Sequence, residues 1–143
     1  MDLGAWMILA DTSAWVEHDR CTESTADERL TRLLVADPRQ LAVTEPVVME
    51  VLAGATSDDR ADMLRRLLGR ATLLRLDPVS DFEAAARAYR RCRSVGFTPR
   101  GLLDCLIAVV AWRRGAAILT WDSDLLRIAR VLGVDVDPAS LPG

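Results

Sequence analysis

Five acidic residues lie where the surrounding sequence is apolar or where a short apolar stretch ends. Asp11 and Asp122 each follow an aliphatic stretch of strand-like composition, and Asp124 begins the helical pattern after Asp122. Glu50 and Asp104 lie inside apolar helical patterns. A buried, unpaired carboxylate is costly, so these side chains need a cation, hydrogen-bond donors or a proton. They are therefore the first candidates for chemistry.

These acids favour a site for a hard divalent cation if the fold brings them together. Two carboxylates about 4 Å apart repel by roughly 4 kcal/mol at an effective dielectric constant of about 20, so a group of them needs positive charge nearby. The chain has one histidine and three cysteines without a C-x-x-C pair, which leaves oxygen ligands. All-oxygen ligation is typical of Mg²⁺, with Mn²⁺ as the alternative.

Each acid also has a simpler structural interpretation. Asp11 suits the N-cap of the helix that follows it, and Glu50 suits an exposed helix face. Arg100 lies four residues before Asp104 and is spaced to form a salt bridge with it. Asp124 suits the first turn of a helix, where the helix dipole favours a negative charge.

The elements that must position these acids alternate between strand and helix along the chain. Strands are predicted at residues 7–10, 41–44, 72–76, 116–120 and 134–136, and helical patterns fill the gaps. This order, without a linker or an internal repeat, predicts one α/β domain over residues 1–143. We expect a three-layer α/β/α arrangement with a short, mainly parallel sheet of about five strands covered by helices on both faces. Sites in such folds lie beyond the carboxyl ends of the strands.

Several helix ends are predicted from capping residues. Ser24 and Ser57 suit N-caps, and Ser80 with Glu83 three residues later has the pattern of a capping box. Pro99 suits the start of a helix that ends at Gly115. A further helix, over residues 123–132, is expected to end at Gly133.

Composition excludes several classes of protein. The 143 residues carry a net charge of −3 and no lysine, so a phosphate-loop G-K-[ST] motif and a Schiff-base lysine are both absent. No uncharged stretch approaches the roughly 18 residues needed to span a bilayer, and the N-terminus lacks the basic residues of a signal peptide. We expect a cytoplasmic protein without a membrane segment, with its three cysteines as buried or inert thiols.

Four short motifs in order resemble the PIN-domain family, and more narrowly the VapC ribonuclease toxins of toxin–antitoxin systems. They are Ile8–Trp15, Glu45–Gly54, Leu103–Ala108 and Thr120–Leu125. The resemblance covers nearly the whole chain. Two departures are that Leu125 stands where many relatives have an aromatic residue, and that six residues precede Met7, where the family often begins.

The resemblance implies a Mg²⁺-dependent (or Mn²⁺-dependent) endoribonuclease that acts on RNA, is held inactive by a VapB-type antitoxin, and works as a homodimer. It also implies residue roles. The acidic metal site would consist of Asp11, Glu50, Asp104 and Asp122, with Asp124 as a further acid, and hydroxyl groups of Thr12, Ser13 and Thr120 would orient the carboxylates.

Other residues are weaker candidates. Trp15 and Trp112 lie in apolar stretches and are expected in the core, whereas Trp121 is placed to be an exposed stacking surface for a base. His18 is interpreted as a surface residue rather than a catalytic base. Arginines gathered around the site would hold the RNA backbone, but the sequence singles out none of them.

Two alternatives belong to other classes of function. The first is a PIN-fold binding module that cleaves little or nothing and acts in a repressor complex with its antitoxin. The second is a phosphotransferase with an aspartate nucleophile, which would want a second aspartate two residues after Asp11 or a nearby lysine. Ser13 stands at that position and the chain has no lysine, so we rank this alternative last.

Overall fold

A computed structural model of the chain describes residues 7–143, and the six residues expected to precede the family's usual start lie outside the described part. Within residues 7–143 the chain forms seven helices and four strands. The strands are β1 (Ile8–Ala10), β2 (Leu41–Val43), β3 (Thr72–Leu73) and β4 (Ala117–Leu119), and the helices are α1 (Thr12–Asp19), α2 (Thr25–Ala36), α3 (Glu45–Ala53), α4 (Asp58–Leu68), α5 (Ser80–Ser94), α6 (Leu102–Arg114) and α7 (Ser123–Leu132).

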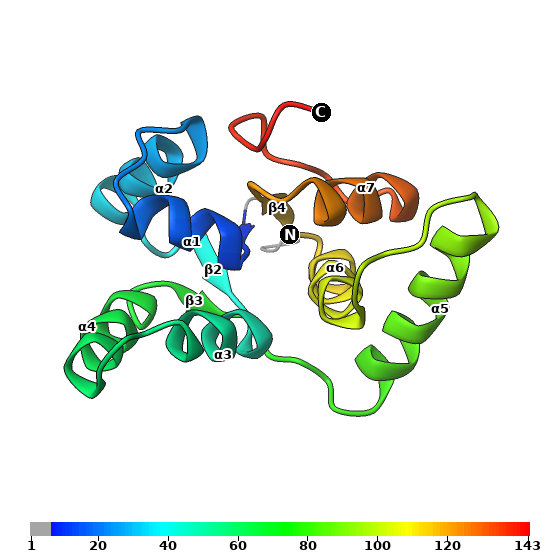
Figure 1. The fold of residues 1–143 in the computed structure, drawn as a ribbon, viewed down its shortest axis with the longest axis horizontal. Helices are drawn as coiled ribbons and strands as arrows, with labels where there is room; N and C mark the ends of the chain where they lie inside the picture. Colours follow the sequence, from blue (N-terminus) through cyan, green and yellow to red (C-terminus); the bar gives the residue numbers. More distant parts are fainter. Residues whose placement is uncertain (1–6) are drawn as a thin grey trace.

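The four strands form one parallel sheet in the order β3-β2-β1-β4. Figure 1 shows α1 and α2 on one side of the sheet and α5, α6 and α7 on the other. The predicted three-layer α/β/α class is confirmed. Because β1 and β4 are parallel neighbours, with Ala10 beside Leu119, the residues that follow these two strands emerge side by side.

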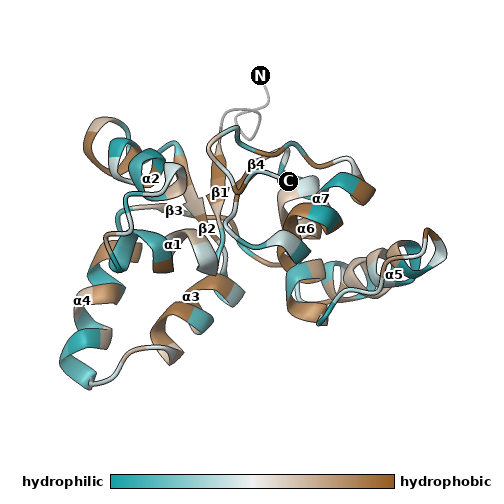
Figure 2. Cartoon of the chain, turned by 45° about the horizontal axis from the view of Figure 1, so that its top comes forward, coloured by the Kyte–Doolittle hydropathy of each residue, from teal (hydrophilic) through white to brown (hydrophobic). Residues whose placement is uncertain are grey.

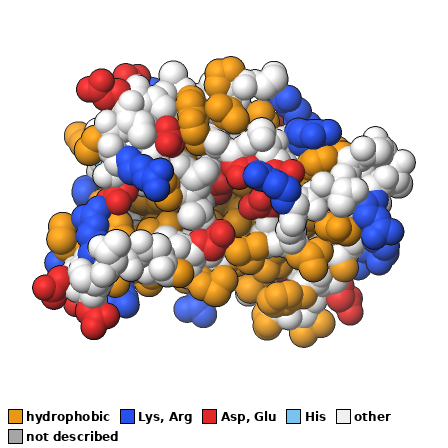
Figure 3. Space-filling model, in the orientation of Figure 1, with side chains coloured by type: hydrophobic (Ala, Val, Ile, Leu, Met, Phe, Trp, Pro, Cys, Tyr) orange, Lys and Arg blue, Asp and Glu red, His pale blue; other side chains and the backbone are white. Residues whose placement is uncertain are grey.

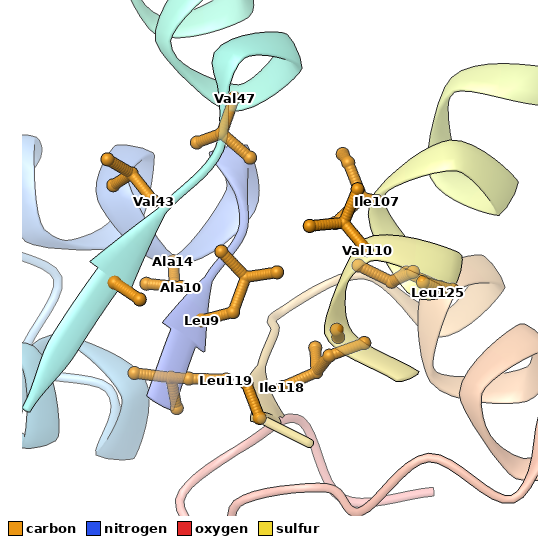
Figure 4. Close-up of a cluster of buried hydrophobic side chains, with 14 of the residues drawn as sticks. Leu9, Ala10, Ala14, Val43, Val47, Ile107, Val110, Ile118, Leu119 and Leu125 are labelled. Atoms are coloured by element: carbon orange, nitrogen blue, oxygen red, sulfur yellow. The ribbon is translucent and has the colours of Figure 1, made fainter. Parts of the chain in front are cut away.

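The core extends over both faces of the sheet, with α1 and α2 packed on one face and α6 on the other. Every residue from Cys105 to Ala111 is buried, which explains why this helix has an apolar sequence on all sides. Figure 4 shows Leu9, Ile118 and Leu125 among the side chains that point toward one another from β1, β4 and α7. Figure 2 shows the strands and much of α6 in the brown of hydrophobic residues, whereas α2 and α4 are mixed in hydropathy.

Several predicted helix ends are confirmed. The Ser24 hydroxyl accepts a hydrogen bond from the backbone of Asp27, and the Ser57 hydroxyl accepts one from the backbone of Arg60. Gly115 and Gly133 end α6 and α7 with φ angles of 65° and 73°, a left-handed conformation that favours glycine.

Two predicted strands are shorter than expected. The strand predicted to reach residue 76 ends at Leu73, at the edge of the sheet. The fifth strand, at residues 134–136, is reduced to a single bridge between Ile118 and Val136. Pairing stops there because the Asp137 side chain accepts the Ala139 N–H and turns the chain, and Pro138 has no N–H to donate.

One predicted helix cap and one predicted helix start are wrong. Ser80 does not cap α5 with its side chain; Asp77 instead accepts the N–H groups of Val79 and Ser80. The helix expected to begin at Pro99 begins at Leu102, because Arg100 donates its backbone N–H to Asp124 and this contact keeps the preceding segment out of the helix.

The structure also bears on the expectations for the cysteines and for a membrane segment. Cys92 and Cys105 are buried as expected, whereas Cys21 is exposed. Among residues 7–143 no helix has the length and apolar character that a membrane span requires.

Candidate active site

Asp11 lies at the carboxyl end of β1 and caps α1. Its Oδ1 accepts the Ala14 N–H at 3.0 Å and the Ser13 hydroxyl at 2.7 Å, and its Oδ2 accepts the Thr120 hydroxyl at 2.9 Å. Only 3% of the residue is exposed. Burial raises the pKa of Asp11 to about 6, although these hydrogen bonds act to lower it. Asp11 therefore has the capping role and also faces the site described below.

Glu50 reaches the same region from α3. It is half-buried, and its Oε1 accepts the hydroxyl of Thr12 at 2.7 Å. Thr12 is the first residue of α1, so this hydrogen bond connects α3 to the helix that Asp11 caps. Glu50 therefore does not lie on the exposed helix face that its simpler interpretation predicted.

Asp104 is the third residue of α6 and lies just before the buried part of that helix. No hydrogen bond to its carboxylate is found among residues 7–143. Its pKa is raised to about 7, first by burial and then by the negative charges of Asp122, Asp11, Glu50 and Asp124. Asp104 is thus the acid at which the repulsion of the group is concentrated.

Asp122 caps α7 and forms a salt bridge with Arg100. Its Oδ1 accepts the N–H groups of Asp124 and Leu125 at 2.7 and 3.2 Å. Nη2 of Arg100 donates to both of its carboxylate oxygens, at 2.9 and 3.0 Å. The salt bridge that spacing suggested between Arg100 and Asp104 is replaced by this one, because Arg100 precedes the helix instead of belonging to it.

Asp124 lies beneath Arg100 rather than in the cavity. Its side chain is 8% exposed, its Oδ2 accepts the Arg100 N–H at 3.0 Å, and its Oδ1 is 3.8 Å from Nε of Arg100. The structure thus separates Asp124 from the other four acids predicted for the metal site.

The other four acids border one cavity of about 470 Å³. It is lined by Asp11, Thr12, Ser13, Glu50, Arg100, Gly101, Leu103, Asp104 and Asp122. Figure 3 shows acidic side chains gathered near the middle of this face, with basic side chains against them. As the side chains stand, no three carboxylate, imidazole or thiol groups in residues 7–143 are placed to hold one metal ion together.

The donor set nevertheless suits a hard cation. The cavity offers four carboxylates, the oxygen ligands that Mg²⁺ and Mn²⁺ prefer, and no nitrogen or sulfur ligand. Burial and then the repulsion of the other acids raise the pKa of Asp104, and a positive charge in the cavity relieves that repulsion. Three hydroxyl groups, those of Thr12, Ser13 and Thr120, hold Glu50 and Asp11 as the resemblance implied.

The remaining candidates differ from expectation in part. Trp15 is buried as predicted, but Trp112 is 65% exposed at the end of α6 and is not a core residue. Trp121 is half-buried rather than an exposed surface. His18 contacts Asp27, with Nδ1 3.0 Å from Oδ1, away from the cavity.

Sequence reasoning paired Arg100 with Asp104 and did not predict that it lines the cavity against Asp122. Its side chain is the basic group that meets the acids, but no local pattern distinguishes it from the other arginines. Its position depends on the start of α6, which a contact with Asp124 from a distant part of the chain determines.

The chain is similar in sequence and in fold to several known proteins. The family model of the PIN domain matches residues 8–131. Ribonuclease VapC11 of Mycobacterium tuberculosis is 46% identical over 125 residues, which cover 87% of this chain and 93% of that protein. DNA-bound VapBC from Salmonella typhimurium has a chain that matches with a TM-score of 0.72 at 18% identity, over 92% of this chain and 96% of that one. A toxin–antitoxin complex from Klebsiella pneumoniae gives 0.64 at 19% identity, over 94% and 96%. At such identities the solved structures show the fold alone.

Proposed function

Because the chain belongs to the PIN-domain family and is a homologue of the VapC ribonucleases, we propose that it is the toxin of a type II toxin–antitoxin system and an endoribonuclease that hydrolyses RNA phosphodiester bonds. The observation that carries this proposal is the cavity bordered by four carboxylates, in which burial and then the repulsion of the other acids raise the pKa of Asp104 to about 7. A protein does not keep such a group for stability, because uncompensated buried charge is destabilising.

We propose that Mg²⁺ is the resident cation, with Mn²⁺ as a substitute, and that Asp11, Glu50, Asp104 and Asp122 hold it. When bound, such a cation activates water and neutralises charge at a phosphate. Asp124 is proposed as a supporting acid, since its carboxylate holds the backbone of Arg100 instead of lining the cavity.

The contribution of the protein is to hold the carboxylates in place before the cation and RNA arrive. Asp11 is fixed at a strand end by two hydroxyl groups and the Ala14 N–H. Ser13 also accepts the Trp121 N–H at 2.7 Å, which ties the segment after β4 to the start of α1. Carboxylates fixed in this way lose little freedom on binding, which favours both metal affinity and a precise alignment of reactants.

The partners of the chain are proposals that rest on the family. They are an RNA substrate, a VapB-type antitoxin and a second copy of the chain. The chain itself is proposed to form a single PIN-like domain over residues 1–143. An apolar groove of about 220 Å³ between α5 and α6, lined by side chains that include Phe82 and Leu106, provides surface suited to a protein partner. Light scattering of the chain alone and with its antitoxin measures both assemblies.

A binding module without turnover is the alternative. It predicts that the antitoxin complex forms normally while no RNA is cut. The acids of the cavity favour the nuclease, because binding to a protein partner does not require four carboxylates around one cavity.

The test is cleavage of a mixed tRNA, rRNA and mRNA pool by the purified protein with Mg²⁺, with Mn²⁺ and with EDTA. Asp11→Asn and Asp104→Asn remove charge from the cavity, and asparagine still caps α1. Asp62→Asn is the matched control, because Asp62 is exposed and pairs only with Arg65 in residues 7–143. Metal-dependent cleavage that both cavity variants lose and the control keeps supports the proposal. Equal inactivity of all four proteins with either metal, with antitoxin binding intact, establishes the alternative.

A further inference from the structure

Arg100 is the one basic residue that lines the acid-bordered cavity within residues 7–143. A single nitrogen of its guanidinium donates to both oxygens of Asp122, while Nε is 3.8 Å from Asp124. The guanidinium therefore takes the place of a cation at one of the four acids. It leaves Asp11, Glu50 and Asp104 without an arginine partner in this part of the chain.

The two ends of Arg100 are held very differently. Its backbone N–H donates to the buried carboxylate of Asp124 at 3.0 Å, whereas 70% of its side chain is exposed. Exposed ion pairs are weak because water competes with them and long side chains lose freedom on pairing. The base of Arg100 is thus fixed beside the cavity, and its guanidinium exchanges partners at little cost.

Arg100 also lies between two cavities. A second cavity of about 580 Å³ lies beside the first, and Arg100 and Gly101 line both. Its other lining residues include Tyr89 and Arg90 of α5. A nucleic-acid strand that places one phosphate among the acids continues past Arg100 into a groove with an aromatic ring and a second guanidinium, groups that suit bases and phosphates.

We infer that Arg100 is a substrate-positioning residue with two alternative partners: Asp122 when the acids hold no cation, and a phosphate of the RNA strand when a cation holds Asp122. This inference rests on the proposed function, because it takes RNA as the substrate and Asp122 as a ligand of the cation. A guanidinium matches either anion, since its planar fork binds a carboxylate and a phosphate in the same way.

The inference predicts opposite changes in two affinities. Loss of the guanidinium removes a competitor for Asp122 and a positive charge near the cation, so metal affinity rises. The same loss removes a phosphate contact, so the affinity for a nucleic-acid strand falls. A purely structural salt bridge predicts neither change, because its loss loosens Asp122 and lowers metal affinity.

The experiment compares wild type, Arg100→Gln, Arg100→Lys and a control, Arg65→Gln. Arg65 pairs with exposed Asp62 and lines neither cavity. Calorimetric titration of the metal-free, full-length protein with Mn²⁺ is expected to show about three- to tenfold tighter binding for Arg100→Gln. Arg100→Lys, which keeps the charge, is expected near wild type, and Arg65→Gln is expected unchanged.

The second measurement uses fluorescence anisotropy with oligodeoxythymidylate in Mn²⁺, a strand with the same phosphates as RNA whose integrity is checked on a gel. Arg100→Gln is expected to bind about five- to tenfold more weakly, with a salt dependence reduced by about one phosphate contact. In RNA cleavage the same variant is expected to raise KM by a similar factor with little change in kcat.

The outcomes separate the inference from the proposed function. Equal or weaker Mn²⁺ binding by Arg100→Gln, or unchanged binding of the oligonucleotide, overturns the role of Arg100 even if the wild type cleaves RNA. If the wild type cuts no RNA with any metal, the proposed function fails, and opposite shifts in the two affinities still establish the exchange of partners. Because the side chain is exposed, thermal unfolding of the variants serves to confirm that they remain folded.

Discussion

Asp81 and Asp11 are equally buried aspartates with opposite surroundings. Asp81 is 2% exposed and Asp11 is 3% exposed. Asp81 receives a two-point salt bridge from Arg113, with Nε to Oδ1 at 2.9 Å and Nη2 to Oδ2 at 2.7 Å. Asp11 receives only hydroxyl and amide hydrogen bonds, and no cation among residues 7–143 pairs with it.

The difference shows how the same residue type serves structure in one region and chemistry in another. Through its salt bridge with Asp81, Arg113 joins α6 to α5, and it also donates to the Arg75 carbonyl at 2.7 Å, which joins α6 to the segment before α5. The pair is complete without a ligand. In the cavity, burial raises the pKa of Asp11 to about 6, and burial followed by the repulsion of the other acids raises that of Asp104 to about 7. No arginine in residues 7–143 pairs with either carboxylate.

The largest expected effect comes from breaking the chemical side of this comparison. Asp104→Asn is expected to lower RNA cleavage in Mg²⁺ by about 100-fold or more, since it removes a carboxylate that nothing else in the cavity replaces. The same change removes a repelled charge, so the metal-free protein is expected to be as stable as wild type or more stable. Single-turnover cleavage and urea unfolding in EDTA measure the two quantities.

A clear loss of stability in Asp104→Asn would show that the acid has a structural role and would weaken the contrast with Asp81. Asp62→Asn, with an exposed acid, controls for the loss of one negative charge.

The second prediction removes the salt bridge between Asp81 and Arg113. Asp81→Asn leaves Arg113 partly buried without its counter-charge and is expected to lower the free energy of unfolding by about 2 kcal/mol, less than for a fully buried pair because Arg113 is one-third exposed. Cleavage per folded molecule is expected to stay within about twofold of wild type. Urea titration measures the free energy of unfolding, and RNA cleavage at low temperature, where the variant is folded, measures activity per folded molecule. A loss of cleavage in fully folded protein would contradict the prediction.

Much of this comparison is visible in the sequence, for physical reasons. Short aliphatic stretches alternate with amphipathic helices, and this order alone predicts a three-layer fold. Asp11 and Asp122 are conspicuous because each ends an aliphatic strand, and Asp104 because it interrupts an apolar helix. The carboxyl ends of neighbouring parallel strands then bring Asp11 and Asp122 to one edge.

What the sequence does not reveal depends on contacts between distant segments. The partner of Arg100 follows from the start of α6, which a hydrogen bond to Asp124 displaces from Pro99 to Leu102. The pair between Asp81 and Arg113 joins two helices and leaves no local pattern. Trp112 was wrongly predicted to be a core residue because α6 is apolar on every face. The hydrophobic periodicity therefore does not show where the helix leaves the core.

The third prediction concerns pH and uses the cavity acids together. The folded pKa of Asp11, about 6, and that of Asp104, about 7, lie above the ordinary value of 3.8 that applies to the unfolded chain. Between pH 4 and 7 the folded state therefore holds protons that the unfolded state has lost. The free energy of unfolding in EDTA is expected to fall as pH rises through this window, with Asp11 contributing about 1–2 kcal/mol after allowance for screening.

Saturating Mg²⁺ is expected to flatten this decline, because the cation binds the deprotonated carboxylates and favours the folded state. Urea unfolding at several pH values, with and without Mg²⁺, tests both statements. Asp11→Asn is expected to reduce the slope in EDTA, and a flat profile for wild type in EDTA would refute the assignment.

The smallest expected effect concerns a hydroxyl group that donates to a cavity acid, whereas Asp81 is bound by an arginine. Thr12 donates to Oε1 of Glu50 at 2.7 Å and is the hydrogen-bond partner of that carboxylate within residues 7–143. Thr12→Val keeps the shape but frees Glu50 to rotate, so Mn²⁺ affinity is expected to fall about two- to fivefold by calorimetry. Stability is expected to change by less than about 0.5 kcal/mol, since water replaces the hydroxyl at a half-buried acid. Thr12→Ser retains the donor and is expected to match wild type. If Thr12→Val destabilises the protein as much as Asp81→Asn does, the hydroxyl acts as a structural tie between α1 and α3, and the cavity acids are not distinguished from Asp81 by the weakness of their partners.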